Sequence, residues 1–350
     1  MNAIMSSREE GELSESGGTR GSAHPMMDSF GRRIDYVRMS ITDRCDLRCR
    51  YCMPERMEFL PRKDLLDLEE VVALADVFIA RGVKRIRLTG GEPLIRKGFA
   101  ELVARLGQRL DLGLEELTIT TNGTQLAAYA DHLAASGVRR VNVSLDTLKS
   151  ERYREITRRG NIEDVLSGIA KASAAGLRIK INMVALASIN DAEIEAMLKF
   201  CIASDHDLTL IETMPLGDTG EVRAPTHLPL ARVEKDLKAR FGLTESAHAT
   251  PGPARYLDVP GSTTRIGFIT PLTQNFCASC NRIRVTATGT VYGCLGRDQK
   301  VELREAWRTG GKEAVMAALD RLLAGKPKGH EFAIEDRNPA VSRFMSTTGG

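Results

Sequence analysis

Six of the seven cysteines in this 350-residue chain form two groups of three. The first group has the spacing CxxxCxxC and the second begins with CxxC, and their members are Cys45, Cys49 and Cys52, then Cys277, Cys280 and Cys294. Clustered thiolates bind zinc or iron–sulfur clusters, and a structural zinc takes four ligands. Each group of three therefore fits a 4Fe-4S cluster with one iron open to a small molecule, and zinc remains the alternative.

A second set of candidate residues is basic. Arg282 and Arg284 lie two residues apart on an expected strand, so their side chains face the same side. Guanidinium groups bind phosphate through paired hydrogen bonds. Arg38, Arg87 and Lys180 lie in β-type apolar stretches, where burying an unpaired charge is costly. These cations predict a site for an anionic substrate.

Six β-type runs alternate with helical segments and must position these residues. We expect strands at residues 36–41, 86–89, 117–121, 141–145, 179–184 and 208–213. The clearest helix covers residues 68–79, with a capping box at Asp67 and Glu70 and a stop at Gly82, and another helix opens at Asn190. Six units are too few for a closed eight-fold barrel. We therefore predict an α/β fold with a partial (β/α)6 TIM-like barrel and functional groups at its strand ends.

Composition divides the chain into four segments. Gly, Ser and Glu dominate the start, which predicts a disordered arm. A barrel, a smaller domain with the second cysteine group and a tail ending in Gly-Gly follow, which gives boundaries at 1–30, 31–250, 251–325 and 326–350. Within the smaller domain we expect a hairpin of residues 282–286 and 290–294 and a helix near 312–323.

The remaining cysteine and the histidines carry no clear site. Cys201 shares a helical face with Met197 and Leu198, which predicts a small buried hydrophobe. The histidines show no paired metal-ligand spacing, so we interpret them as surface or incidental residues: His24, His132, His206, His227, His248 and His330.

Charge and hydropathy exclude several classes of protein. Lys and Arg number 49 and Asp and Glu 46, so the net charge of +3 gives no overall field to attract nucleic acid or anionic lipid. No apolar run approaches the roughly 20 residues that span a bilayer. The acidic start lacks the apolar stretch of a signal peptide. We expect a cytoplasmic protein with reduced thiols and neither nucleic acid nor membrane as a partner.

Two motifs together resemble the radical S-adenosylmethionine (SAM) superfamily: CxxxCxxC with Tyr51 inside it, and GGEP at residues 90–93. The second cysteine group, the segment CNRIRVT at residues 280–286 and the terminal Gly349 and Gly350 narrow the resemblance. This combination is similar to the GTP 3′,8-cyclase family, molybdenum cofactor biosynthesis protein A (MoaA). The resemblance covers about residues 31–350.

The resemblance implies two 4Fe-4S clusters held by the two cysteine groups, with SAM bound at the first. It implies cofactor contacts from Tyr51, Gly91, Ser144 and Met214. It implies GTP contacts from Arg38, Arg87, Thr120, Lys180, Arg282, Ile283 and Arg284. It assigns direct catalytic roles to Arg282, Arg284, Gly349 and Gly350. Some family members carry an arginine where this chain has Thr209, which makes the phosphate contacts from that strand differ.

The implied activity is that of a lyase that converts GTP to 3′,8-cyclo-7,8-dihydro-GTP through a 5′-deoxyadenosyl radical, the first step of molybdenum cofactor biosynthesis. The implied partners are cyclic pyranopterin monophosphate synthase downstream, a reduced flavodoxin or ferredoxin as electron donor, and a second copy of the chain in a homodimer. Two alternatives stay open: a radical SAM enzyme with an auxiliary cluster that acts on a peptide, and a zinc-binding adaptor without catalysis.

Overall fold

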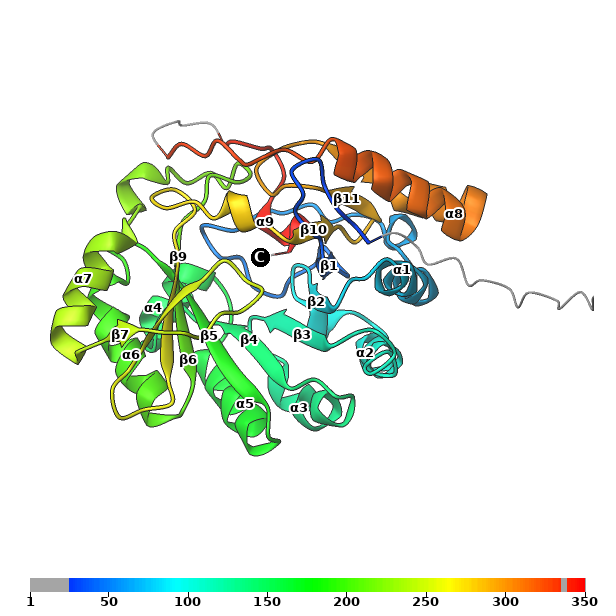
Figure 1. Ribbon diagram of the computed structural model, residues 1–350. Coiled ribbons are helices and arrows are strands. Elements are labelled where there is room, and N and C mark those ends of the chain that lie inside the picture. Colours follow the sequence, from blue (N-terminus) through cyan, green and yellow to red (C-terminus); the bar gives the residue numbers. More distant parts are fainter. Residues whose placement is uncertain (1–24, 335–338, 350) are drawn as a thin grey trace, which may run out of the picture.

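The computed structural model describes residues 25–334 and 339–349, and most of the expected N-terminal arm lies outside them (Figure 1). Its described strands form one 12-stranded sheet in the order β12-β11-β10-β1-β2-β3-β4-β5-β6-β9-β8-β7. Helices pack along the outer face of this curved sheet (Figure 1). Of the helices that the structure describes, none has the length and apolar character to cross a bilayer.

Six parallel strands form the centre of the sheet, each within two residues of its predicted bounds. They are β1 (Tyr36–Ser40), β2 (Arg85–Thr89), β3 (Glu116–Thr121), β4 (Arg140–Ser144), β5 (Arg178–Ala185) and β6 (Asp207–Glu212). The helices that cover them are α1 (Leu68–Ala80), α2 (Phe99–Gly107), α3 (Leu126–Ala135), α4 (Ser150–Thr157), α5 (Ile162–Ala174) and α6 (Ile194–Ala203). The predicted partial barrel is confirmed.

Helix α1 begins and ends as its sequence predicts. The Asp67 carboxylate accepts from the Glu70 amide at 2.7 Å, and the Glu70 carboxylate accepts from the Asp67 amide at 3.0 Å. Gly82 has a φ of +86°, which a side chain would disfavour. The apolar stripe of this helix packs fully buried against the sheet, as at Leu74 and Phe78.

The helical segment opens after Asn190, as predicted, but as a 3-10 turn rather than an α-helix. A 3-10 turn at Asp191–Glu193 precedes α6, and the Asn190 side chain makes no cap hydrogen bond. Its amide nitrogen instead donates to the carbonyl oxygens of Asp146 and Val184 at 2.8 and 2.9 Å. Asn190 therefore connects the loop after β4 to the end of β5. These two hydrogen bonds to residues distant in sequence replace the helix-cap hydrogen bond that its side chain could otherwise make.

The C-terminal part of the chain extends both edges of the sheet. One edge gains β9 (Arg265–Ile269) parallel to β6, then β8 (Arg255–Asp258) and β7 (Thr244–Glu245), with α7 (Leu230–Phe241) nearby. The other gains β10 (Arg282–Val285) parallel to β1, then β11 (Thr290–Tyr292) and β12 (Lys300–Glu302). The predicted hairpin is β10–β11. The expected helix near 312–323 is the second half of α8 (Leu303–Ala324), which is kinked at Gly311, and α9 (Met345–Thr348) follows.

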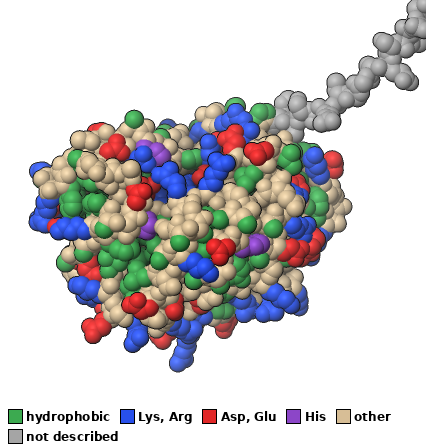
Figure 2. All heavy atoms as spheres, turned by 90° about the horizontal axis from the view of Figure 1, so that it is seen from below, with side chains coloured by type: hydrophobic (Ala, Val, Ile, Leu, Met, Phe, Trp, Pro, Cys, Tyr) green, Lys and Arg blue, Asp and Glu red, His purple; other side chains and the backbone are tan. Residues whose placement is uncertain are grey.

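Cys201 has no exposed surface and packs in the core, as predicted. His206 corrects the interpretation of the histidines, because it is buried and lies edge-on to Phe200 with ring centroids 6.1 Å apart. His24 lies outside the described residues. On the face drawn in Figure 2, basic and acidic side chains are interspersed, in keeping with the net charge of +3.

Candidate active site

A first cavity lies at the carboxyl ends of the barrel strands. Its lining includes the three cysteines of the first group, and the structure brings all four predicted SAM-contact residues to the same cavity: Tyr51, Gly91, Ser144 and Met214. The three thiols are free and partly buried. Sequence-distant segments thus meet at one site because each follows the end of a parallel strand.

The GGEP turn holds the cysteine loop by backbone contacts. The Gly91 amide donates to the carbonyl oxygen of Thr42 at 2.8 Å, and the Glu92 amide donates to that of Arg44 at 2.8 Å. A Cβ on Gly91 would overlap the Arg44 carbonyl, and one on Gly90 would overlap that of Thr42. The two glycines therefore let the GGEP turn approach the cysteine loop closely, and both also line the first cavity.

Glu92 joins this turn to the end of β3. Its buried carboxylate accepts from the Leu94 amide at 3.0 Å, from Thr121 Oγ1 at 2.8 Å and from the Asn122 amide at 2.6 Å. Burial raises the pKa of Glu92 to about 8. The Asn122 side chain in turn donates to the Asp46 carboxylate at 2.7 Å, beside Cys45. The cysteine loop is therefore positioned from two strands.

Tyr51 is held by a carboxylate from the neighbouring strand end. Its hydroxyl donates to Asp146 Oδ2 at 2.7 Å, and Asp146 Oδ1 accepts from the Val184 amide at 2.8 Å. Burial raises the pKa of Asp146 to about 6. Asp146, which the sequence did not single out, thereby sets the orientation of the aromatic ring at the cavity.

The first thiols suit an iron–sulfur cluster. Burial raises the pKa of Cys52 to about 11 and those of Cys45 and Cys49 further, so the thiolates need a bound cation for stability. A 4Fe-4S cluster takes one thiolate at each of several corners, and the three free thiols of this loop could supply them.

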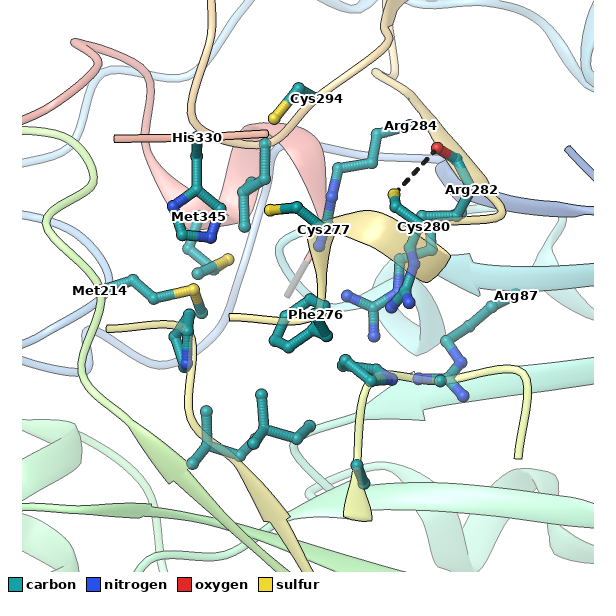
Figure 3. A pocket seen from close by; sticks show the side chains of 18 of the residues that line it. Arg87, Met214, Phe276, Cys277, Cys280, Arg282, Arg284, Cys294, His330 and Met345 are labelled. Carbon is teal, nitrogen blue, oxygen red and sulfur yellow. Dashed lines mark hydrogen bonds between the residues drawn. The ribbon is translucent and has the colours of Figure 1, made fainter. Parts of the chain in front are cut away.

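A second cavity adjoins the first. Its lining contains the second cysteine group together with five of the seven predicted GTP-contact residues: Arg38, Arg87, Lys180, Arg282 and Arg284 (Figure 3). Thr120 lines the first cavity instead. Ile283 lines neither and is fully buried in the core, because neighbouring side chains on β10 point to opposite faces.

The cations of the second cavity lie close together, with Glu116 contributing opposite charge near Arg87 and Asp207 near Lys180. Arg87 and Arg282 lie over the ring of Tyr36, with centroid distances of 5.5 and 5.9 Å. Burial lowers the pKa of Arg87 to about 10. Burial and then the charge of Arg87 lower the pKa of Lys180 well below its usual value. This concentration of positive charge favours a polyanionic ligand.

Several buried polar atoms at the two cavities have no hydrogen-bond partner. They are Arg38 Nε, Thr120 Oγ1, Asn142 Oδ1 and Arg282 Nε. An unpaired buried polar group costs about 1–3 kcal/mol, so such groups are suited to receive a ligand. Thr209 Oγ1 is also buried without a partner, but Thr209 has no exposed surface and lines neither cavity.

The C-terminal tail reaches both cavities. Met345 on α9 lines both, as do Asn182, Ile211 and Met214, so the cavities share a wall. Arg284 Nη1 donates to the carbonyl oxygens of Thr348, at 3.2 Å, and Gly349. Gly349 therefore lies at the site, whereas Gly350 lies outside the described residues.

Sequence reasoning missed two residues of the second cavity region. The Lys326 ammonium donates to the Cys280 thiol at 3.5 Å and to the Gly293 carbonyl at 2.8 Å. Burial raises the pKa of Cys280, but Lys326 and Arg282 outweigh it and the net pKa is lowered. His330, interpreted as incidental, lines the cavity. Both follow a helix in a short irregular segment with no periodic pattern that would have marked them.

Comparison with known proteins divides the chain just before β6. The family model described as Radical SAM superfamily matches residues 39–201, and the model described as Molybdenum Cofactor Synthesis C matches residues 206–332. The first range holds the first cysteine group and the second range holds the other.

Curated relatives match along nearly the whole chain. A GTP 3′,8-cyclase of Rhizobium leguminosarum bv. trifolii is 52% identical over 331 residues, which is 94% of this chain and 95% of that protein. A GTP 3′,8-cyclase of Agrobacterium fabrum is 54% identical over 330 residues, 93% of this chain and 95% of that protein.

Solved structures share the fold at low sequence identity. Streptococcus suis SuiB bound to S-adenosylmethionine superposes with a TM-score of 0.60 and 16% identity, covering 93% of this chain and 77% of SuiB. From the extent and identity of the curated matches, the chain belongs to the GTP 3′,8-cyclase family of radical SAM enzymes.

Proposed function

We propose that this chain converts GTP to 3′,8-cyclo-7,8-dihydro-GTP by radical SAM chemistry, the first step of molybdenum cofactor biosynthesis. The observation that carries the proposal is the shared wall between two cavities, each lined by three cysteines, with arginine and lysine side chains at the second. That arrangement suits a cofactor in one cavity and an anionic substrate in the next.

Cys45, Cys49 and Cys52 would hold one 4Fe-4S cluster and the other cysteine group would hold a second. When bound, the clusters supply one-electron reduction of SAM in the first cavity and an open iron for the substrate base in the second. Tyr51, Gly91, Ser144 and Met214 would contact SAM. Asp146 positions Tyr51 through their 2.7 Å hydrogen bond.

The triphosphate would lie among Arg38, Arg87, Lys180 and Arg282, whose like charges lie close together. Charge-assisted hydrogen bonds from these groups would fix the nucleotide and exclude water. Thr120 would contact the substrate from the first cavity. Any contact from Ile283 would run through its backbone, because its side chain is in the core.

The shared wall explains how the reacting groups would meet. Asn182, Ile211, Met214 and Met345 line both cavities, so the two cavities adjoin. Reaction between a SAM fragment and a ribose requires close approach, and ligands bound in adjoining cavities would meet at these residues. Gly349 and Gly350 would complete the boundary at the tail.

Anaerobic incubation of the reduced, cluster-loaded protein with SAM and GTP tests the proposal. The expected products are 5′-deoxyadenosine and the cyclised nucleotide in equal amounts. Formation of 5′-deoxyadenosine without a cyclised nucleotide would assign the enzyme another substrate, for example a peptide. A colourless zinc protein after reconstitution with iron and sulfide would instead support the adaptor alternative.

The remaining partners are proposed from family membership alone. Cyclic pyranopterin monophosphate synthase would consume the product, and a reduced flavodoxin or ferredoxin would supply electrons. A homodimer and a cytoplasmic location complete the proposal. Size-exclusion chromatography with light scattering tests the dimer, and product formation with each purified electron donor tests the reductant.

A further inference from the structure

His330 lies at the second cavity in a position that the assigned cluster ligands and cations leave unexplained. It lines the cavity, and Figure 3 shows it beside Met345, with Arg282 and Arg87 on the other side of the view. Its Nε2 atom is buried and has no hydrogen-bond partner. A buried ring nitrogen without a partner is costly in the free protein and available to a ligand.

The two segments that carry the cysteines hold the imidazole in place. Gly329 packs so closely on Cys277 that an added Cβ would lie 3.0 Å from the cysteine Cβ. A Cβ on Gly296, two residues after Cys294, would lie 2.8 Å from the His330 Cβ. On its other side the ring stacks on Phe332, with centroids 4.1 Å apart and an interplanar angle of 25°. The ring therefore has little freedom to turn.

The surroundings of His330 also define its tautomer. Burial and then the nearby charge of Arg297 lower its pKa, so the ring is neutral. The Phe332 amide approaches Nδ1 at 3.4 Å as a donor, which leaves the ring proton on Nε2. Nε2, the buried ring atom without a partner, is thus an N–H donor without charge.

We infer that His330 Nε2–H donates a hydrogen bond to the O6/N7 edge of the guanine base. This inference rests on the proposed function and adds a residue that selects the base. Guanine presents acceptors at both O6 and N7, whereas adenine presents an amino donor in place of O6. A neutral donor beside the apolar side chains of Met345 and Phe332 suits a base better than it suits a phosphate.

The test compares three nucleotides on the cluster-loaded full-length protein by equilibrium dialysis under anaerobic conditions. They are GTP, 2-aminopurine riboside triphosphate, which lacks O6, and 7-deaza-GTP, which lacks N7. The variant is His330→Phe, which retains an aromatic ring to stack on Phe332 and removes the donor. His132→Phe on α3 is the matched control for a histidine replaced far from the cavities.

The expected result is about tenfold weaker binding of GTP to His330→Phe, the loss of one hydrogen bond to a buried partner. Binding of one analogue should be unchanged by the substitution, and that analogue identifies the accepting atom. Equal weakening of all three nucleotides would indicate a merely structural role and overturn the inference, as would unchanged binding of all three. Failure of the wild type to bind GTP would instead contradict the proposed function.

Iron content and the electron paramagnetic resonance signal of each cluster show whether the variant is assembled. If His330→Phe loses the second cluster, His330→Gln, which restores an N–H donor, is compared with His330→Met, which has similar length and no donor. Tighter GTP binding by the Gln variant supports the inference, and equal binding by the two overturns it.

Discussion

The guanidinium of Arg284 donates to the carbonyl oxygen of Thr348 at 3.2 Å, so a strand arginine holds the C-terminal tail at the second cavity. Arg282, its neighbour on the same face of β10, instead leaves Nε buried without a partner. The two arginines were predicted as an equivalent phosphate-binding pair. Their contacts divide them into one residue that is free for substrate and one that positions the tail.

We predict that Arg282→Ala weakens GTP binding by about 10- to 100-fold, because a charge-assisted hydrogen bond is worth about 1.5–3 kcal/mol. Arg284→Ala should weaken binding less and lower the turnover number more, since it releases the tail. Equilibrium dialysis and product formation measure the two effects, with iron content as the control for assembly. Unchanged affinity in the double variant would place the triphosphate elsewhere.

Gly349→Ala should reduce turnover at least tenfold while both clusters remain assembled. Gly349 has a φ of +73°, and an added Cβ would overlap the Cγ2 atom of Thr89. Thr89→Ser removes Cγ2 and keeps the hydroxyl, so the double variant should recover part of the activity. Deletion of Gly349 and Gly350 should have an effect as large as Gly349→Ala, and undiminished turnover after deletion would remove the tail from the mechanism.

Iron analysis of cysteine variants tests the ligand sets separately. The cluster-loaded wild type should contain roughly eight irons per chain. Replacing any cysteine of one group with alanine should leave roughly four irons and the signal of the other cluster only. Cys201→Ala is the control, because its buried thiol lies in the core, and it should retain all the iron while losing about 1–2 kcal/mol of stability. Loss of iron in that control would contradict the assignment of three cysteines to each cluster and of Cys201 to the core.

Much of the barrel could be predicted from the sequence because the signals are local. The capping box of Asp67 and Glu70 involves residues three apart, and apolar periodicity marked the strands. The cysteine spacing likewise predicted that each group of three gathers at one site, and each group does line one cavity. The same reasoning could have excluded an Ile283 side-chain contact, since Arg282 and Arg284 on one face of β10 require the residue between them to face the other way.

The rest depends on contacts between segments far apart in sequence. The pairing of β10 with β1 matches Arg38 to Arg284, and no local pattern specifies that register. Asn190 has the residue type of a helix cap, but its side chain bonds to Asp146 and Val184. Lys326 and His330 lie in an irregular segment whose position is defined only by packing against the cysteines.

Lys326→Met should shift the reduction potential of the second cluster to more negative values by roughly 60 mV, the one-electron equivalent of a tenfold change. A cation 3.5 Å from the Cys280 sulfur stabilises the more negative, reduced cluster, and the substitution removes that charge. Lys328→Met, at an exposed position two residues away, is the control. Redox titration followed by electron paramagnetic resonance measures both, and equal potentials in the two variants would exclude this electrostatic role.

Lys180 makes GTP binding depend on pH. Its pKa in the free protein is lowered by burial and by Arg87, so above that lowered pKa the amine is neutral. It donates a hydrogen bond to the Tyr256 hydroxyl. A bound triphosphate raises the pKa again, so binding takes up a proton and affinity falls as pH rises, by at most tenfold per pH unit. The affinity for GTP should be measured above about pH 8, where the phosphate groups no longer change protonation state.

Calorimetry in buffers of different ionisation enthalpy should detect the proton uptake in the wild type and not in Lys180→Met.

The lowered pKa of Lys180 also determines the sign of its effect on the stability of the fold. Because the pKa of Lys180 is lower in the folded protein than in the unfolded chain, protonation of Lys180 favours unfolding. This cost is absent above the unfolded pKa of 10.5 and is complete once the pH has fallen below the folded pKa. Lys180→Met should therefore melt at a higher temperature than the wild type at neutral pH without GTP, and bind GTP at least tenfold more weakly. A lower melting temperature together with unchanged affinity would show that Lys180 serves the fold and not the substrate.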